Sequence, residues 1–156
     1  MKIYLRFVTD RLSLQSALIR FATRSWCSHC GFLRTDDQQN PIDTLDSRLN
    51  GGVKIRPYGY DKVTAESWFT APNIQAAYDF GLTLIGQKYD WLDILGIGFN
   101  TRQHAEGHYI CSSFIDACGK AASPMQWTNV HFPSRLVTPR DLLASPAIVR
   151  VRRVIG

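Results

Sequence analysis

Three short strand-like segments separated by turn sequences constrain the fold more than any other feature. They cover residues 30–35, 42–47 and 53–56, of which the last alternates clearly between apolar and polar residues. A segment rich in Asp, Gln and Asn that ends in Pro41 separates the first two, and residues 50–52 (Asn-Gly-Gly) separate the last two. Both connections have typical turn sequences. The pattern therefore predicts an antiparallel meander.

Further strand and helix patterns flank this meander. Residues 2–8 and 148–155 alternate as strands, and residues 12–22 have the spacing of an amphipathic helix. Two more helices are predicted, one after Asn73, which is a candidate N-cap, and one that begins at Cys111. The order of strand, helix, strands, helices and strand predicts an α+β fold.

The composition is that of a single globular domain. With 156 residues, 45% of them hydrophobic and 20% charged, we expect one domain over residues 1–156. The sequence has no apolar run that could span a membrane and no recognisable signal peptide, so the expected location is cytoplasmic. The formal net charge of +5 would suit an anionic partner. The basic residues are scattered, however, and no nucleic-acid-binding motif occurs, so no nucleic-acid partner is expected.

Cysteine and histidine spacing does not predict a metal site. Cys27 and Cys30 form a C-x-x-C pair, but no second pair follows at zinc-site spacing, and the pair precedes a strand rather than a helix. His104 and His108 are four residues apart in a polar segment that contains a glycine. We therefore expect no metal and no other cofactor.

Cys111 stands at the predicted N-terminus of an amphipathic helix. Apolar or small residues recur after it with a 3.6-residue period, and Ser112 and Ser113 place hydroxyl groups near the helix start. The partial positive charge of a helix N-terminus favours the thiolate, which is the nucleophilic form of cysteine. Its N–H groups can also hold an oxyanion. The alternative is a buried cysteine on the core face of the helix.

A thiolate nucleophile needs an imidazole to carry its proton, and His29 begins a predicted strand. If residues 35–40 form the turn to the next strand, Arg34 lies opposite Pro41 and His29 lies opposite Asp46. Opposed Cβ atoms are about 5 Å apart, so Asp46 could accept the His29 N–H and fix its tautomer. A shorter or longer turn would place Thr44 or Arg48 opposite His29 instead.

Five segments together resemble a known family. They are residues 28–33 (Ser-His-Cys-Gly-Phe-Leu), 52–57 (Gly-Val-Lys-Ile-Arg-Pro), 86–91 (Gly-Gln-Lys-Tyr-Asp-Trp), 109–114 (Tyr-Ile-Cys-Ser-Ser-Phe) and 138–142 (Thr-Pro-Arg-Asp-Leu). Their order resembles the permuted papain-like hydrolases of the NlpC superfamily, in particular the YiiX-like branch. The resemblance implies a circularly permuted papain-like fold, with an antiparallel, barrel-like sheet packed against helices.

The same resemblance implies roles for individual residues. Cys111 would be the nucleophile, His29 the general base and acid, and Asp46 the residue that orients His29. Tyr89 and Trp91 would shape the substrate-binding site. Where the family often has valine after the histidine, this chain has Cys30, and it has Ser113 where the family often has an acidic residue. Cys27, Cys30 and Cys118 are interpreted as structural.

Three functions remain open. The first is a cysteine hydrolase that cleaves an amide bond in a peptide or cell-wall-derived substrate through a Cys111 thioester. The second is a lipid-directed thiol acyltransferase or phospholipase of the same fold, with an apolar rim formed by Trp68, Phe69 and residues 92–99. The third is a non-catalytic basic binding module. Neither the substrate nor the oligomeric state follows from the sequence.

Overall fold

The computed structural model describes residues 1–88, 109–122, 127–128 and 137–155. Its strands are β1 (Lys2–Thr9), β2 (His29–Thr35), β3 (Pro41–Arg48), β4 (Gly52–Pro57), β5 (Ala65–Thr70) and β6 (Val149–Ile155). Its helices are α1 (Leu14–Thr23), α2 (Ile74–Thr83), α4 (Cys111–Ala122) and α5 (Pro139–Leu143). The predicted meander is confirmed as β2, β3 and β4, whereas β5 and α5 were not predicted.

One antiparallel sheet holds all six strands, in the order β4-β3-β2-β1-β5-β6. The predicted α+β architecture with an antiparallel sheet is confirmed. The expected barrel-like closure is wrong, because the two edge strands, β4 and β6, do not pair with each other. The outer edge of β4 pairs instead with the chain after α2. Val53 N–H donates to the Gln87 carbonyl (2.9 Å), and Gly86 N–H donates to the Val53 carbonyl (3.0 Å). These bonds protect an edge that would otherwise expose unpaired backbone groups.

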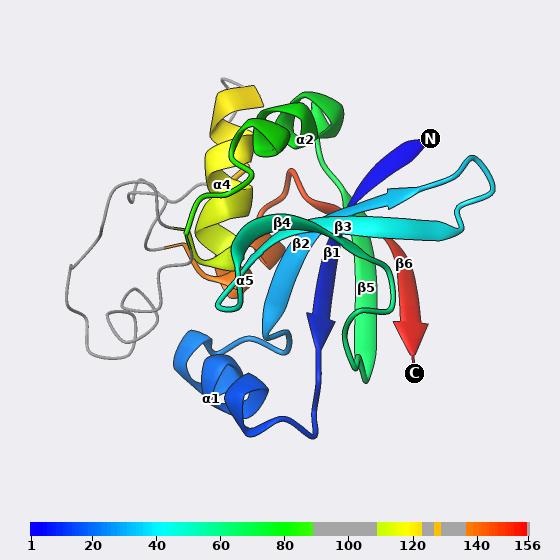
Figure 1. Cartoon of the computed structure of the whole chain (residues 1–156). Helices are drawn as coiled ribbons and strands as arrows, with labels where there is room; N and C mark the ends of the chain where they lie inside the picture. Colours follow the sequence, from blue (N-terminus) through cyan, green and yellow to red (C-terminus); the bar gives the residue numbers. More distant parts are fainter. Residues whose placement is uncertain (89–108, 123–126, 129–136, 156) are drawn as a thin grey trace.

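Helices α2 and α4 lie side by side over one face of the sheet and enclose the main core (Figure 1). Phe32 of β2 is at its centre, with ring centroids 5.9 Å from both Tyr78 of α2 and Phe114 of α4. A Cβ atom at Gly81 would lie 3.1 to 3.3 Å from side chains of the sheet and of α4. Glycine at this position therefore lets α2 approach both layers closely.

The opposite face of the sheet carries a smaller cluster of Tyr4, Leu33 and Trp68. Trp68 and Phe69 are buried, one on each side of β5, so ordinary core packing, the preferred interpretation of these two residues, is confirmed and they form no apolar rim. Successive residues of a strand point to opposite faces, and both faces of this strand are covered. The other segment of the expected rim, residues 92–99, lies outside the described residues.

Helix α1 lies apart from α2 and α4, at the other end of the sheet (Figure 1). Ser13 caps its N-terminus by accepting the Ser16 N–H at 3.3 Å, and only Thr23 within it is buried. The cap predicted for α2 differs from the observed one. Asn73 occupies the N-cap position but has a left-handed backbone (φ 54°), and its side chain makes no cap hydrogen bond. No described helix has the length and apolar character needed to cross a bilayer.

Candidate active site

His29 and Asp46 are hydrogen-bonded side chains on neighbouring strands. The His29 Nε2 atom lies 2.7 Å from the Asp46 Oδ2 atom. His29 is the first residue of β2, and its side chain is 15% exposed, whereas the Asp46 side chain on β3 is 1% exposed. The sheet thus holds a half-buried imidazole against a fully buried carboxylate.

The contact forms through a different strand register from the predicted one. Arg34 pairs with Asp43 rather than Pro41, and Thr35 pairs with Pro41, because a bulge follows Arg34. Asp46 comes level with Gly31, where an added Cβ would lie 2.7 Å from the Asp46 Cβ. The imidazole therefore reaches the carboxylate diagonally, past a glycine that leaves the space open. A diagonal separation of about 7–8 Å between positions is within the reach of long side chains.

Two arginines complete the surroundings of Asp46. Arg48 Nε donates to Asp46 Oδ2 at 2.7 Å, and Arg56 Nη1 donates to Asp46 Oδ1. Burial alone would raise the pKa of Asp46, but His29, Arg48 and Arg56 together hold that pKa well below its usual range. Asp46 is therefore a carboxylate near neutral pH and can only accept hydrogen bonds.

The protonation of Asp46 fixes the roles of the two imidazole nitrogens. Since the carboxylate only accepts, His29 Nε2 carries the hydrogen and donates it, which leaves Nδ1 for a second partner. Burial and the charge of Arg48 would lower the pKa of His29, but the negative charges of Cys111 and Asp46 raise it above its ordinary value. The site therefore favours a charged imidazolium between two anions.

Cys111 is the first residue of α4 and is buried beside Cys30 and His29. Cys30 and His29 lie close enough to the Cys111 sulfur for both to change its ionisation. Burial opposes ionisation, but the Cys30 thiol first and then the charge of His29 hold the pKa of Cys111 well below that of an ordinary thiol. The partial positive charge at the helix N-terminus also favours the thiolate.

For the other three cysteines the surroundings raise the pKa of the thiol instead of lowering it. Burial raises the pKa of Cys27 to about 12 and also raises the pKa of Cys118 on α4. Burial and the neighbouring Cys111 raise the pKa of Cys30. All four cysteines are free and buried. Cys111 is thus the thiol that this environment ionises.

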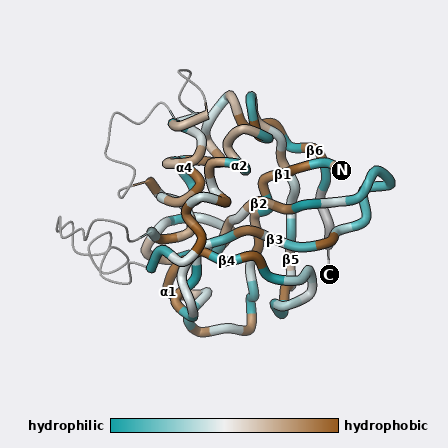
Figure 2. The backbone as a smooth tube through the Cα atoms, turned by 45° about the horizontal axis from the view of Figure 1, so that its top comes forward, coloured by the Kyte–Doolittle hydropathy of each residue, from teal (hydrophilic) through white to brown (hydrophobic). Residues whose placement is uncertain are grey.

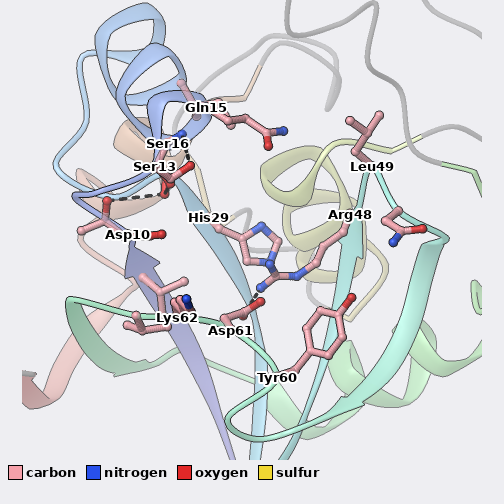
Figure 3. A pocket seen from close by; sticks show the side chains of 16 residues that line it. Asp10, Ser13, Gln15, Ser16, His29, Arg48, Leu49, Tyr60, Asp61 and Lys62 are labelled. Atoms are coloured by element: carbon pink, nitrogen blue, oxygen red, sulfur yellow. Dashed lines mark hydrogen bonds and ion pairs between the residues drawn. The ribbon is translucent and has the colours of Figure 1, made fainter.

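A cavity of about 580 Å³ opens beside His29, between α1 and the loop that follows β4. Figure 3 shows His29 near its centre, with Ser16 of α1 on one side, Arg48 on the other and Tyr60 below. Most of its lining side chains are polar or charged. Of the two candidate catalytic side chains, His29 lines this cavity and Cys111 does not.

Two expected site residues lie outside the described part of the chain. They are the residues assigned to the substrate-binding site, Tyr89 and Trp91.

Comparisons with known proteins find similar solved structures but no matching family. No family model and no curated protein matches the chain. A crystal structure described as "metalloprotein yiiX from Escherichia coli O157:H7, DUF1105" matches with a TM-score of 0.69 and 17% identity. The match covers 98% of this chain and 97% of that one. The chain has a yiiX-like fold. At this identity the likeness establishes the fold alone, and the chemistry depends on the residues described above.

Sequence reasoning missed several contributors to the site within this yiiX-like fold. Arg56 also donates to the backbone carbonyls of Asn50 and Gly52, both at 3.1 Å, and so ties the β3–β4 turn to Asp46. Cys30 is buried in the core, where it was interpreted as structural, and it also lowers the pKa of Cys111. The available signal was the departure of Cys30 from the valine that is usual after the histidine.

Proposed function

We propose that this protein is a cysteine hydrolase that cleaves an amide bond in a polar substrate through a thioester on Cys111. The observation that carries the proposal is the hydrogen bond between His29 Nε2 and Asp46 Oδ2 at 2.7 Å, in a buried site where Cys111 and His29 influence each other's ionisation. A nucleophile, a base in contact with it and a third group that orients the base form the basic unit of nucleophilic catalysis.

The first half of the reaction forms the thioester. The Cys111 thiolate attacks the amide carbonyl carbon and gives a tetrahedral oxyanion, which the Cys111 N–H at the start of α4 is placed to stabilise. The C–N bond then breaks, and the His29 imidazolium gives its Nδ1 proton to the leaving amine. Asp46 holds the imidazole through Nε2 throughout these steps.

The second half releases the acid and restores the enzyme. Neutral His29 takes a proton from a water molecule, whose oxygen attacks the thioester carbonyl. The C–S bond breaks, the carboxylic acid leaves, and the thiolate–imidazolium pair forms again. The proton that His29 gives to the amine in the first half is thus replaced by one from water in the second.

The cavity beside His29 supports a polar substrate such as a peptide or a cell-wall-derived fragment. Its lining carries hydroxyl groups from Ser13 and Ser16 and charged groups from Arg48, Asp61 and Lys62. Such groups orient a substrate by hydrogen bonds. A lipid-directed thiol enzyme is the second candidate, but Trp68 and Phe69, which were considered for its apolar rim, are buried.

We further infer that the fold is the circularly permuted papain-like arrangement. Two observations support this assignment: the histidine strand β2 precedes the cysteine helix α4 along the chain, and the fold is yiiX-like. The resemblance of the sequence segments points the same way.

The structural relative is described as a metalloprotein, so we tested whether the residues of this site fit a metal ion. Within the described ranges, no group of three or more His, Cys, Asp or Glu side chains is arranged to hold one. The carboxylate of Asp46 is in addition engaged by Arg48 and Arg56, and two positive charges disfavour a cation there. These residues do not fit a metal centre, and the proposed steps use none.

The experiment that tests the proposal is alkylation of the native protein with iodoacetamide across pH, followed by peptide mass analysis of each cysteine. We expect Cys111 to react at pH 6, where an ordinary thiol is almost fully protonated. The His29→Ala variant should react there about tenfold or more slowly, since the charge that stabilises the thiolate is lost. Cys118, on the same helix, is the internal control and should remain unreactive in both proteins.

Two outcomes would contradict the proposal. If Cys111 reacts no faster than Cys118, Cys111 is a core cysteine and the binding-module interpretation leads. If Cys111 reacts fast but a Cys111→Ala variant still cleaves a peptide that the wild type cleaves, the thiol is reactive without being the nucleophile.

A further inference from the structure

Three of the large apolar side chains of α1 point away from the protein, whereas Ile19 faces the cavity. Leu14, Leu18 and Phe21 share one helix face at i, i+4 and i+7 and are 77%, 61% and 86% exposed. Leu12, just before the helix, and Trp26, just after it, extend this surface. We call these five residues the α1 apolar face. Exposed apolar surface gathered on one element marks an interaction site.

The opposite side of α1 belongs to the cavity. Ser13, Ser16 and Ile19 line the cavity beside His29, and the Ser16 hydroxyl lies 2.8 Å from that of Ser28. The helix is therefore anchored by its polar side, and its apolar side is left outward. Figure 2 shows hydrophobic and hydrophilic residues mixed along the coil of α1, as in an amphipathic helix.

The charges around the α1 apolar face are mainly positive. Residues 11–24 contain three arginines, Arg11, Arg20 and Arg24, and no acidic residue, whereas Asp10 just before them accepts the Leu12 N–H at 3.0 Å. Arginines beside an exposed stripe of Leu and Phe are typical of helices that lie in the headgroup region of anionic bilayers.

We propose that the α1 apolar face docks this protein on an anionic lipid surface. A second copy of the chain is the other apolar partner to consider, but a symmetric contact would place Arg11, Arg20 and Arg24 against their own copies. Lipid headgroups of negative charge instead complement these arginines. The proposal goes beyond the proposed hydrolase function and does not depend on it.

Docking in this way has a geometric consequence for the candidate active site. An α-helix with its side chains is about 10–12 Å in diameter. Because α1 lies between the apolar face and the cavity, the cavity beside His29 comes within about one helix diameter of the headgroups. A polar substrate borne on that surface is then within reach of the site.

The test is co-sedimentation of the full chain with two kinds of vesicle, phosphatidylcholine alone and phosphatidylcholine mixed with phosphatidylglycerol. We expect binding to the mixed vesicles and at least tenfold weaker binding to the neutral ones. The Leu18→Ser/Phe21→Ser variant should lose roughly tenfold or more in affinity, because two apolar side chains no longer enter the bilayer. The Arg11→Gln/Arg24→Gln variant should lose about tenfold, and about 0.5 M NaCl should weaken wild-type binding likewise.

The matched control is Ile85→Ser, which removes an exposed apolar side chain after α2 and should bind as the wild type does. Circular dichroism should show an unchanged fold for every variant, since all these side chains are exposed. Cys111→Ser should also bind as the wild type does, so failure of the hydrolase proposal leaves this result unaffected.

Three results would overturn the docking proposal. They are no sedimentation with mixed vesicles, undiminished binding by the Leu18→Ser/Phe21→Ser variant, and self-association of the wild type that this variant abolishes while vesicles are ignored. The last result would assign the α1 apolar face to a second copy of the chain.

Discussion

Two neighbouring side chains, Cys30 and His29, lower the pKa of Cys111, and the contribution of Cys30 is the less expected of them. Hydrogen bonds to a charged group are worth about 1.5–3 kcal/mol. Removing the Cys30 thiol should therefore make ionisation of Cys111 more difficult, even though His29 remains. Cys30 is a positioning residue in this scheme, because it acts through Cys111.

A pair of substitutions tests this role of Cys30. Cys30→Ala should slow alkylation of Cys111 at pH 6 by about tenfold or more, because the thiolate loses a donor. Cys30→Ser keeps a hydroxyl donor and should restore much of the rate. Equal rates in the wild type and the Cys30→Ala variant, measured by peptide mass, would show that Cys30 only fills space.

Gly31 is the second residue with an unforeseen role, since Asp46 occupies the space that a side chain at position 31 would need. Gly31→Ala should push Asp46 away from His29 and lower the free energy of unfolding by about 1–3 kcal/mol. Urea denaturation measures the stability, and alkylation of Cys111 at pH 6 reports the loss of the His29–Asp46 contact. A variant as stable and as reactive as the wild type would place the Asp46 backbone elsewhere.

The residues of the site were only partly predictable from the sequence. Cys111, His29 and Asp46 could be selected because a helix start, a strand start and a hairpin place them near each other. The hairpin register could not be fixed, because it depends on the bulge after Arg34 and on a turn in which Gln39 has φ 66°. Neither feature has a distinctive sequence pattern. The catalytic roles themselves stay predictions.

At the scale of elements, strand β5 was missed, and the inward face of helix α1 could not be predicted, for different reasons. Strand β5 (Ala-Glu-Ser-Trp-Phe-Thr) is buried on both faces, so it lacks the alternation that identifies a half-exposed strand. Helix α1 has clear amphipathic spacing, and its extent was predicted to within a few residues. The spacing does not reveal which face turns inward, and here the polar side faces the protein.

The start of α4 is tied to the segment before α5 by one side-chain hydrogen bond. Ser112 Oγ donates to the Val137 carbonyl at 2.7 Å, in a buried setting next to Cys111. Ser112→Ala should lower the free energy of unfolding by about 1–3 kcal/mol, because the buried carbonyl loses this donor. Thermal or urea unfolding measures the loss.

Ser113→Ala is the matched control for this bond. Ser113 is equally buried and donates to the Ile110 carbonyl at 3.1 Å, but that carbonyl also accepts the Phe114 N–H at 2.9 Å. Its loss should therefore cost less. A larger effect at Ser113 than at Ser112 would refute the proposed tie between the two helices.

At the scale of the whole molecule, buried ion pairs connect strands across one face of the sheet. Arg6 of β1 pairs with Glu66 of β5 at 2.8 Å. Arg48 of β3 forms ion pairs with both Asp46 of the same strand and Asp61 in the loop after β4. Removing one partner of a buried pair is costly, at about 3–5 kcal/mol, because the other charge is left without compensation.

Asp46 makes the stability of the protein depend on pH. Its pKa in the folded state lies below the unfolded value of about 3.9, so its contribution is present above that value and is lost as the pH falls through the folded pKa. Asp46→Asn should therefore destabilise the protein by about 3 kcal/mol at pH 7, and the difference from the wild type should shrink at pH 3. Urea denaturation at both values checks this.

Asp37→Asn is the control for this pH dependence. The Asp37 side chain is 79% exposed, so its replacement should leave the dependence of stability on pH unchanged. An Asp46→Asn variant whose deficit is as large at pH 3 as at pH 7 would show that packing, and not charge, accounts for the loss.

The chain order of β2, β3 and α4 has a consequence during synthesis. His29 and Asp46 meet within one hairpin, whereas Cys111 follows 65 residues after Asp46. At about 5–20 residues per second, the ribosome makes that interval in roughly 3–13 s. A nascent chain thus holds the imidazole and its carboxylate well before it holds the thiol. The reactive sulfur enters the protein only when most of the sheet that will bury it has already been made.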